Sequence, residues 1–422
     1  MQRLPTELLG IIISFLVESD PTQRQDTLLA VSLVSHRLQE IARPHLFRTV
    51  HVKCKYYGNT VQDFREFLHI HPRIHDHVQE LRLLGNVHKW DHCLDPTVLS
   101  ISLLKDILNH LHKLQSLVVS RMNVELRMGE PLECGLWARI RTLLLRTVQV
   151  SAEDFLHMLS LFSQIQSLEL SDVLLWPASD NQYGALECKD SHRLHAASTS
   201  HIGHVRLSTE YPYSSLLQML VNPILGPIHS CAFVCIKQGQ LRSVATFLSQ
   251  TGRDVTRLSL DLCLLPMNGR GNYEPDGSLP DVIIALKHSF ELCTELAHLH
   301  LSLCMSCACQ ENTQGDQTIF RMMMDLIGCL PRGKLRSLTL ELASAQNVPC
   351  PHSAHLWMCV EDEGWAKLRE VYDRFENLES VELLDDGAQY RAGQAAHQAK
   401  DVRARQEAFG LPLTPSLNAL SG

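Results

Sequence analysis

The sequence predicts an α/β fold built from a repeated strand–loop–helix unit, preceded by a separate helical segment. Two observations carry the prediction of a repeat. A short apolar pattern recurs ten times between residues 78 and 383, and amphipathic helical patterns lie between its copies. A third observation, a strongly apolar helical stretch at residues 4–16, marks the N-terminal segment.

The recurring pattern reads apolar, two residues, apolar, one residue, apolar, as in "LQSLVV" and "IQSLEL". Its copies begin at Val78, Leu114, Ile140, Ile165, Ile202, Ile228, Val255, Leu296, Leu335 and Leu378, and successive starts are 25 to 43 residues apart. The last two apolar residues alternate with polar ones, which predicts a half-buried strand. The inner face should therefore be rich in leucine, and the outer face in Ser, Thr, Arg, Glu and His.

Helices are expected between these strands. The amphipathic stretches are 98–111, 151–162, 240–250, 281–293, 319–330 and 364–375. The second of them opens with Ser151 and Asp154 in the spacing of a capping box. Parallel strands that alternate with helices at this period are the unit of a leucine-rich-repeat-like solenoid, in which each unit buries the leucine face of its neighbour. The longer gaps are rich in Gly, Pro, Ser, Asn and Asp and predict surface loops at 176–200, 266–281, 306–318 and 344–357.

The composition indicates a large globular protein. The chain has 422 residues, of which 45% are hydrophobic and 20% charged, and a formal net charge of −8. No nucleic acid or anionic membrane is expected as a partner, because positive charge is not in excess. No apolar run approaches the roughly 20 residues of a membrane helix, and residues 4–16 lack the features of a signal peptide. The 14 scattered cysteines indicate free thiols in a reducing compartment, so we expect a cytoplasmic or nuclear protein.

The N-terminal stretch "LPTELLGIIISFL" carries apolar residues around most of its helical circumference. Fifty residues in three short helices bury too little area to cover all of that surface. We therefore expect one face to pack on sister helices and another to bind a partner. The alternative is a plain N-terminal cap of the solenoid, which also needs an apolar helix.

Residues 4–50 resemble an F-box. The resemblance rests on an opening Leu-Pro-x-Glu, an Ile/Leu-rich helix, the block Leu-x-x-Val-Ser-x-Val-Ser and a closing "LFR". The stretch "ARPHLFRTVHV" looks especially like the F-box proteins of mushroom-forming fungi, which often carry degenerate leucine-rich repeats behind the box. The chain departs from the pattern in a longer stretch between the first two helices, "VESDPTQRQD", and in Leu38, which stands where Trp is usual.

The resemblance implies the substrate-recognition subunit of an SCF-type ubiquitin ligase. Its F-box would dock the cullin adaptor of the SCF complex, and the solenoid would bind a target protein that the sequence does not name. The resemblance assigns adaptor binding to Leu4, Pro5, Glu7, Leu8, Ile12, Leu28, Val31, Val34 and Ser35. The alternative function is a leucine-rich-repeat interaction scaffold without a ubiquitin role.

Three segments are predicted from these patterns. Residues 1–50 form the F-box, residues 51–385 the solenoid, and residues 386–422 a polar, Ala-rich tail expected to be disordered.

The sequence predicts no catalytic residue, cofactor or metal site, and hence no enzyme, although an enzyme with an unrecognised site is a third hypothesis. Cys304, Cys307 and Cys309 lack the second ligand pair of a zinc site and are interpreted as free thiols in a loop. The histidines of "HIHPRIHDH" at 69, 71, 75 and 77 are interpreted as a helix end and a turn, with Pro72 as the helix breaker.

The outer face of the predicted sheet is the candidate surface for the target protein. Its charged residues are Arg82, Arg146, Glu169, Arg206, Arg257, Asp261, His300 and Glu341. Mixed charge on a sheet face suits protein recognition, and the four arginines can hold an anionic group if they cluster. For any single residue, a solvated position without a partner is the alternative.

Overall fold

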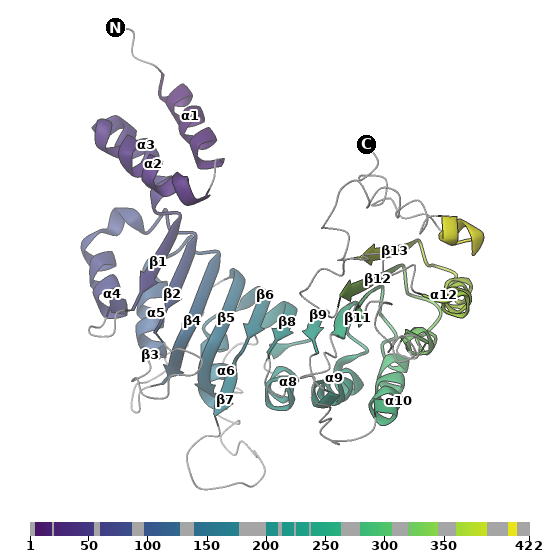
Figure 1. Cartoon of the computed structure of the whole chain (residues 1–422). Helices are drawn as coiled ribbons and strands as arrows, with labels where there is room; N and C mark the ends of the chain where they lie inside the picture. The colour runs from purple at the N-terminus through teal and green to yellow at the C-terminus, as the bar shows by residue number, and fades with distance from the viewer. Residues whose placement is uncertain are drawn as a thin grey trace, which may run out of the picture. The chain divides into compact units, whose positions relative to one another are not determined.

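A computed structural model of the chain describes residues 5–18, 21–54, 60–86, 97–126, 139–176, 200–209, 213–222, 225–235, 238–262, 279–305, 320–321, 323–344, 360–385 and 404–411. The chain divides into two compact units, Met1–His201 and Ile202–Gly422 (Figure 1). Each unit combines helices with parallel strands, as the repeat predicts.

The first unit begins with three helices and continues with strands and covering helices. Its elements are α1 (Thr6–Glu18), α2 (Pro21–Val34), α3 (His36–Leu46), β1 (Thr49–Lys53), α4 (Thr60–Ile70), the 3-10 turn Pro72–Ile74, β2 (Glu80–Leu84), β3 (Val98–Ser100), α5 (Ile101–His110), β4 (Ser116–Glu125), β5 (Ile140–Ser151), α6 (Ala152–Ser160), β6 (Gln164–Ser171) and β7 (Leu174–Trp176). The strands lie in the order β1-β2-β4-β5-β6 and are parallel, with β3 beside β4 and β7 beside β5.

The second unit repeats the alternation of strand and helix. Its elements are β8 (His201–Ser208), α8 (Ser214–Leu220), β9 (Ser230–Val234), α9 (Gln238–Thr251), β10 (Arg257–Leu262), α10 (Leu279–Glu291), β11 (His298–Met305), β12 (Ser337–Ser344), α12 (Asp362–Arg374) and β13 (Ser380–Asp385). The strands follow one another in chain order and are all parallel. Helices α8, α9 and α10 lie next to one another along this unit (Figure 1).

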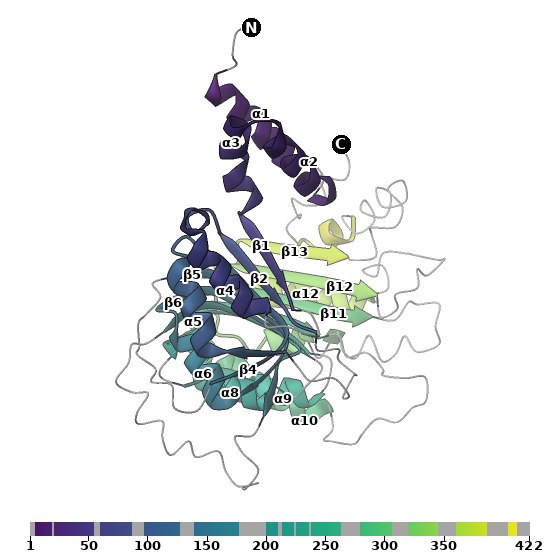
Figure 2. The same cartoon turned by 90° about the vertical axis from the view of Figure 1, so that its left-hand side faces the viewer.

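Every copy of the apolar pattern contains a strand, so the predicted parallel strands are confirmed. The register also explains the leucines. In the first unit Leu81, Leu117, Leu143 and Leu168 are neighbours across four strands, and each is fully buried. Burial of one such side chain contributes roughly 1.5–3 kcal/mol. Helices α4, α5 and α6 lie side by side in this unit and carry buried apolar residues of their own (Figure 2).

Strands β4 and β5 are longer than the pattern predicts because each continues past a residue with a positive φ. Arg121, Thr147 and Asp172 have φ values of 56°, 53° and 51°. They follow residues that are aligned across β4, β5 and β6, so the three strands change direction at the same level. Gly85 directly follows β2, the strand next to β4, and lies at the same level as Arg121. A Cβ on Gly85 would lie 2.0 Å from the carbonyl oxygen of Arg121, so only glycine fits there. Beyond this corner β3 and β7 add to the sheet.

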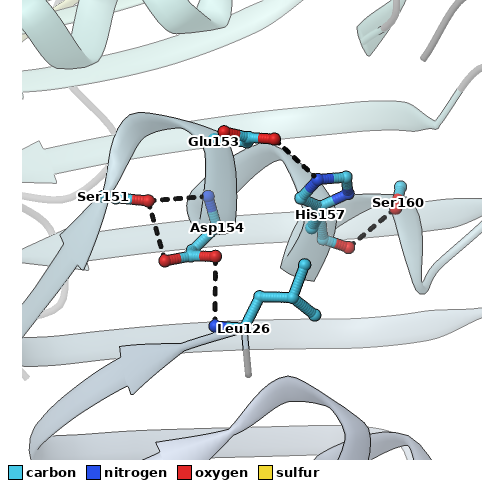
Figure 3. Close-up of polar contacts among 6 residues, drawn as sticks. All are labelled: Leu126, Ser151, Glu153, Asp154, His157 and Ser160. Atoms are coloured by element: carbon cyan, nitrogen blue, oxygen red, sulfur yellow. Dashed lines mark hydrogen bonds and ion pairs between the residues drawn. The ribbon is translucent and has the colours of Figure 1, made fainter. Parts of the chain in front are cut away.

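The predicted helix start is confirmed, with Ser151 as the N-cap of α6. The Ser151 hydroxyl accepts a hydrogen bond from the Asp154 backbone N–H at 3.0 Å and donates one to the Asp154 carboxylate at 2.7 Å (Figure 3). The same carboxylate accepts the backbone N–H of Leu126 at 3.1 Å. Asp154 therefore joins the N-terminus of α6 to the end of β4.

The predicted helices are all found, with shifted ends. Stretch 98–111 begins with three residues of strand β3 before α5 starts, and residues 323–327 are helical within the predicted 319–330. The pattern missed β1, β3, β7 and α8. The four predicted loops lie outside the described residues except at their ends. Among the described residues, no helix is long and apolar enough to cross a membrane.

Part of the tail that the sequence predicts to be disordered is ordered. Residues 404–408 form a helical turn against α12, where the Phe409 ring stacks on Trp365 with centroids 6.0 Å apart. Arg405 donates a hydrogen bond to the Val360 carbonyl at 2.8 Å, and Leu411 is buried. Two apolar side chains, Phe409 and Leu411, therefore give this part of the polar tail an anchor. The other tail residues after 385 lie outside the described ranges.

Replacing Asp154 with Ala removes the carboxylate that accepts the Ser151 hydroxyl and leaves the Leu126 N–H without its acceptor, while the Ser151 cap keeps its backbone hydrogen bond. We expect the free energy of unfolding to fall by about 2 kcal/mol, measured by urea denaturation followed by circular dichroism. The neighbouring Glu153→Ala is the control, because its carboxylate is exposed and makes only a 3.6 Å ion pair with His157. It should change stability by less than about 0.5 kcal/mol. Equal losses in the two variants would contradict the stabilising role of the Asp154 carboxylate.

Candidate functional site

Helices α1, α2 and α3 pack on one another around a small core. Ile13, Leu28 and Ala42, one from each helix, are at most 1% exposed. Val31, Leu38, Ile41 and Leu46 pack against them and are partly buried. The Arg37 guanidinium donates a hydrogen bond to the Thr6 hydroxyl, which joins the start of α3 to the start of α1. This core uses only part of the apolar surface of the three helices.

Four apolar side chains of α1 face away from this core. Leu8, Ile11 and Ile12 are half-exposed, and Phe15 is 68% exposed. At 3.6 residues per turn these four positions fall within an arc of about 100°, and Ile13 points about 150° away from its centre. We call Leu8, Ile11, Ile12 and Phe15 the α1 arc. One face of the helix therefore packs inward while the α1 arc meets solvent.

Helix α2 adds a second set of exposed apolar side chains. Leu33 is 86% exposed, Val34 is 72% exposed and Leu29 is half-exposed. Helices α1 and α2 are in contact, so both sets belong to one small bundle. A folded protein seldom leaves this many large apolar side chains in water unless they bind a partner.

The residues assigned from the F-box resemblance divide into three groups. Pro5 and Glu7 are exposed at the start of α1, and Leu8, Ile12 and Val34 are exposed or half-exposed apolar residues. Leu28 is buried and Val31 packs against the core, so both side chains stabilise the packing of the bundle. Ser35 is the N-cap of α3, where its hydroxyl accepts the Leu38 N–H at 3.2 Å. Leu4 lies outside the described residues.

Four exposed residues were not among the assigned ones: Ile11, Phe15, Leu29 and Leu33. Helical spacing alone groups Ile11 and Phe15 with Leu8 and Ile12, because residues three and four apart share a helix face. The buried Ile13 was also overlooked, since nothing in the apolar run "GIIISFL" says which isoleucine turns inward.

In the first unit, the predicted target-binding residues lie on the outward face of the sheet. The registers place Arg82 level with Val118, Leu144 and Glu169, and Arg146 level with Ser120 and Ser171. Arg82 makes an ion pair with Glu80 at 2.6 Å, so its charge is already balanced. Arg146 is exposed. These two arginines therefore occupy different rows and do not form one cationic site.

In the second unit, two of the predicted residues, His300 and Glu341, are in contact. His300 Nε2 lies 3.1 Å from the Glu341 carboxylate, and His300 Nδ1 lies 3.3 Å from the Ser259 hydroxyl. Asp261 shares a row with Glu341, two strands away. Arg206 and Arg257 lie on β8 and β10 of the same face and are exposed.

The described part of the chain contains no group of three or more His, Cys, Asp or Glu side chains placed to hold a metal ion. The Cys304 side chain, Cys307 and Cys309 lie outside what the structure describes. Four of the five described free cysteines are buried, and burial raises the pKa of the Cys54 thiol to about 11 and of the Cys293 thiol to about 12. Such thiols stay protonated at neutral pH and are poor nucleophiles.

Three imidazoles gather where α4, the following turn and α5 meet. The His110 ring lies 5.0 Å from that of His75 and 6.1 Å from that of His69, measured between centroids. His75 Nε2 is 2.8 Å from the Leu68 carbonyl. Burial, and then the charges of His75 and His69, lower the pKa of His110, with a smaller contribution from His112, while Asp106 acts in the opposite direction.

Residues 1–53 match the F-box-like family model, which ends with the last residue of β1. The match covers α1–α3 and all of the exposed apolar residues described above for α1 and α2. No curated protein matches the chain.

A pH dependence follows from the lowered pKa of His110. The unfolded chain binds a proton near pH 6.5 and the folded chain only at lower pH, so stability is complete above about pH 6.5 and falls as the pH drops below it. We expect His110→Asn to make the melting temperature fall less between pH 7 and pH 5 than in the wild type, measured by scanning calorimetry. An unchanged slope would contradict the assignment to His110.

Proposed function

We propose that this chain is the substrate-recognition subunit of an SCF-type ubiquitin ligase. In this proposal the α1–α3 bundle docks the cullin adaptor, and the outward face of the parallel sheet binds a target protein. The observation that carries the proposal is the α1 arc, an exposed apolar face inside residues 1–53, which match the F-box-like model. No catalytic role is proposed.

The α1 arc has the energetics of a docking surface. Full burial of one large apolar side chain contributes roughly 1.5–3 kcal/mol, and these residues are already about half-buried. A partner that covers the four side chains therefore gains several times the energy of one contact. An Asp placed at the centre of such an interface leaves an unpaired carboxylate out of water, which costs more than the lost contact itself.

The α1–α3 bundle is joined directly to the sheet, which supports a function that uses both parts. Only Phe47 and Arg48 separate α3 from β1, and both use backbone hydrogen bonds. The Phe47 N–H donates to the Arg43 carbonyl at 3.1 Å, and the Arg48 carbonyl accepts the N–H groups of Gln79 and Glu80 at 2.9 Å. β1 then pairs with β2 along its whole length. The family match thus extends into the sheet without an intervening linker.

Replacing Ile12 or Phe15 with Asp should abolish co-purification with the recombinant cullin adaptor of an SCF complex. Both side chains lie in the α1 arc and neither belongs to the core cluster of the bundle, so circular dichroism should show a folded chain. The control is Ile284→Asp on α10, because Ile284 is an equally exposed isoleucine in the second unit. It should bind the adaptor like the wild type.

Adaptor binding that persists in both α1 variants would show that the docking face is wrongly assigned. If the wild-type chain does not bind the adaptor at all, the alternative of an interaction scaffold without a ubiquitin role becomes the better account.

A further inference from the structure

On the outward face of the second unit, basic and acidic residues lie mostly at opposite ends of the strands. The register aligns three rows across β8 to β13. The first row consists of His204, Ser230, Arg257, His298, Ser337 and Ser380 and contains no carboxylate. The third row consists of Ser208, Val234, Asp261, Ser302, Glu341 and Leu384 and contains no cation. The middle row runs from Arg206 on β8 to Glu382 on β13, and Glu379 lies next to Arg336, so the N-terminal part of the face is positive from β8 to β12 but not at β13. The C-terminal part is negative.

Three arginines lie at the positive side. Arg206 is on β8, Arg257 on β10, and Arg336 directly precedes β12. All three are exposed, and none makes an ion pair or a side-chain hydrogen bond with any residue the structure describes. Several other basic residues of the same unit are paired instead. Ion pairs with carboxylates at 2.7–3.5 Å hold Arg321, Lys334, Lys367 and Arg369.

Two of these arginines, Arg257 and Arg336, lie near the same imidazole, that of His298. Burial, followed by the charges of Arg257 and Arg336, lowers the pKa of this imidazole, and Glu379 opposes them. His298 is the direct neighbour of Arg257 on β11. Between Arg206 and Arg257 lies β9, whose outward residues Ser230 and Ala232 are small. Nothing bulky on β9 therefore separates those two guanidinium groups.

The distance between the arginines indicates how long a ligand must be to contact all three. Each is two strands from the next, and strands lie about 4.8 Å apart with a rise of about 3.3 Å per residue. Adjacent arginines are thus roughly 10–12 Å apart at their Cα atoms. A single phosphate is too small to contact all three. In a peptide in the polyproline II conformation that crosses the strands, every third residue lies on the same side and advances about 9 Å, which is close to this spacing.

We propose that Arg206, Arg257 and Arg336 bind an acidic segment of a target protein in the polyproline II conformation, with carboxylates about three residues apart. The inference rests on the proposed function in that it gives the chemistry of the target that the sheet face would hold. The net charge of −8 repels an acidic peptide at long range, so binding would have to come from this local surface. Asp261, Glu341 and Glu382 repel the segment from the rest of the face and confine it to the arginines.

The test uses the full chain and three fluorescein-labelled twelve-residue peptides. The first repeats Glu-Gly-Ser, the second replaces each Glu with Gln, and the third is the Gln peptide with one phosphoserine. The sheet variant is R206Q/R257Q/R336Q. The control variant R242Q/R253Q/R374Q loses the same charge from three exposed arginines of the second unit that lie outside its strands. Binding is measured by fluorescence anisotropy at low ionic strength.

We expect the wild-type chain to bind the Glu peptide at least about tenfold more tightly than the Gln peptide, and the sheet variant to lose that difference. The control variant should stay within about twofold of the wild type. Each single Arg→Gln change should weaken binding about two- to fourfold, which keeps the test valid if the triple variant folds poorly. Raised salt should weaken wild-type binding.

Three results would overturn the proposal. They are no binding of the Glu peptide to the wild type, equal loss in the sheet and control variants, and tighter binding of the phosphoserine peptide than of the Glu peptide. The last result would indicate a site for a single phosphate. Adaptor binding is measured separately on the same proteins. Its absence in the wild type would count against the proposed function and leave the peptide result standing.

Discussion

A leucine of this sheet is buried by the leucines of the strands on either side together with the helices that cover them. Leu81, Leu117, Leu143 and Leu168 stand in one row, each fully buried, and the next row has the same character. One strand with its helix cannot hide these side chains from water, so parallel neighbours are required. The constraint fixes the inward positions and leaves the outward ones open to any polar residue. The charge separation of the second unit is carried by those unconstrained positions.

The strands were predictable because this burial requirement repeats the same apolar pattern, and most helices because of their apolar spacing. What escaped prediction depends on contacts that the local sequence does not show. The corner at Arg121, Thr147 and Asp172 has a residue typical of turns only in Asp172, and its left-handed backbone is aligned across the three strands. The order of residues 404–411 depends on Trp365, which lies some forty residues earlier in the chain.

The N-terminal surface was predictable in kind but not residue by residue. The excess of apolar residues correctly indicated that some of them face solvent, and Ile12 and Leu8 do. A motif, however, combines residues that hold the bundle together with residues at its surface. Leu28 belongs to the first group and Leu33 to the second, although both are leucines of α2. Only the packing of three helices around Ile13 separates the two groups.

The central claim is that the first fifty residues use their solvent-facing apolar side chains to hold the cullin adaptor. Hydrogen–deuterium exchange of the intact chain, with and without the recombinant adaptor, tests it most directly. The account predicts slower exchange in α1 and α2 when the adaptor is present, and unchanged exchange in β4, β5 and the strands of the second unit. Protection confined to the sheet, or no protection anywhere at saturating adaptor, would contradict it.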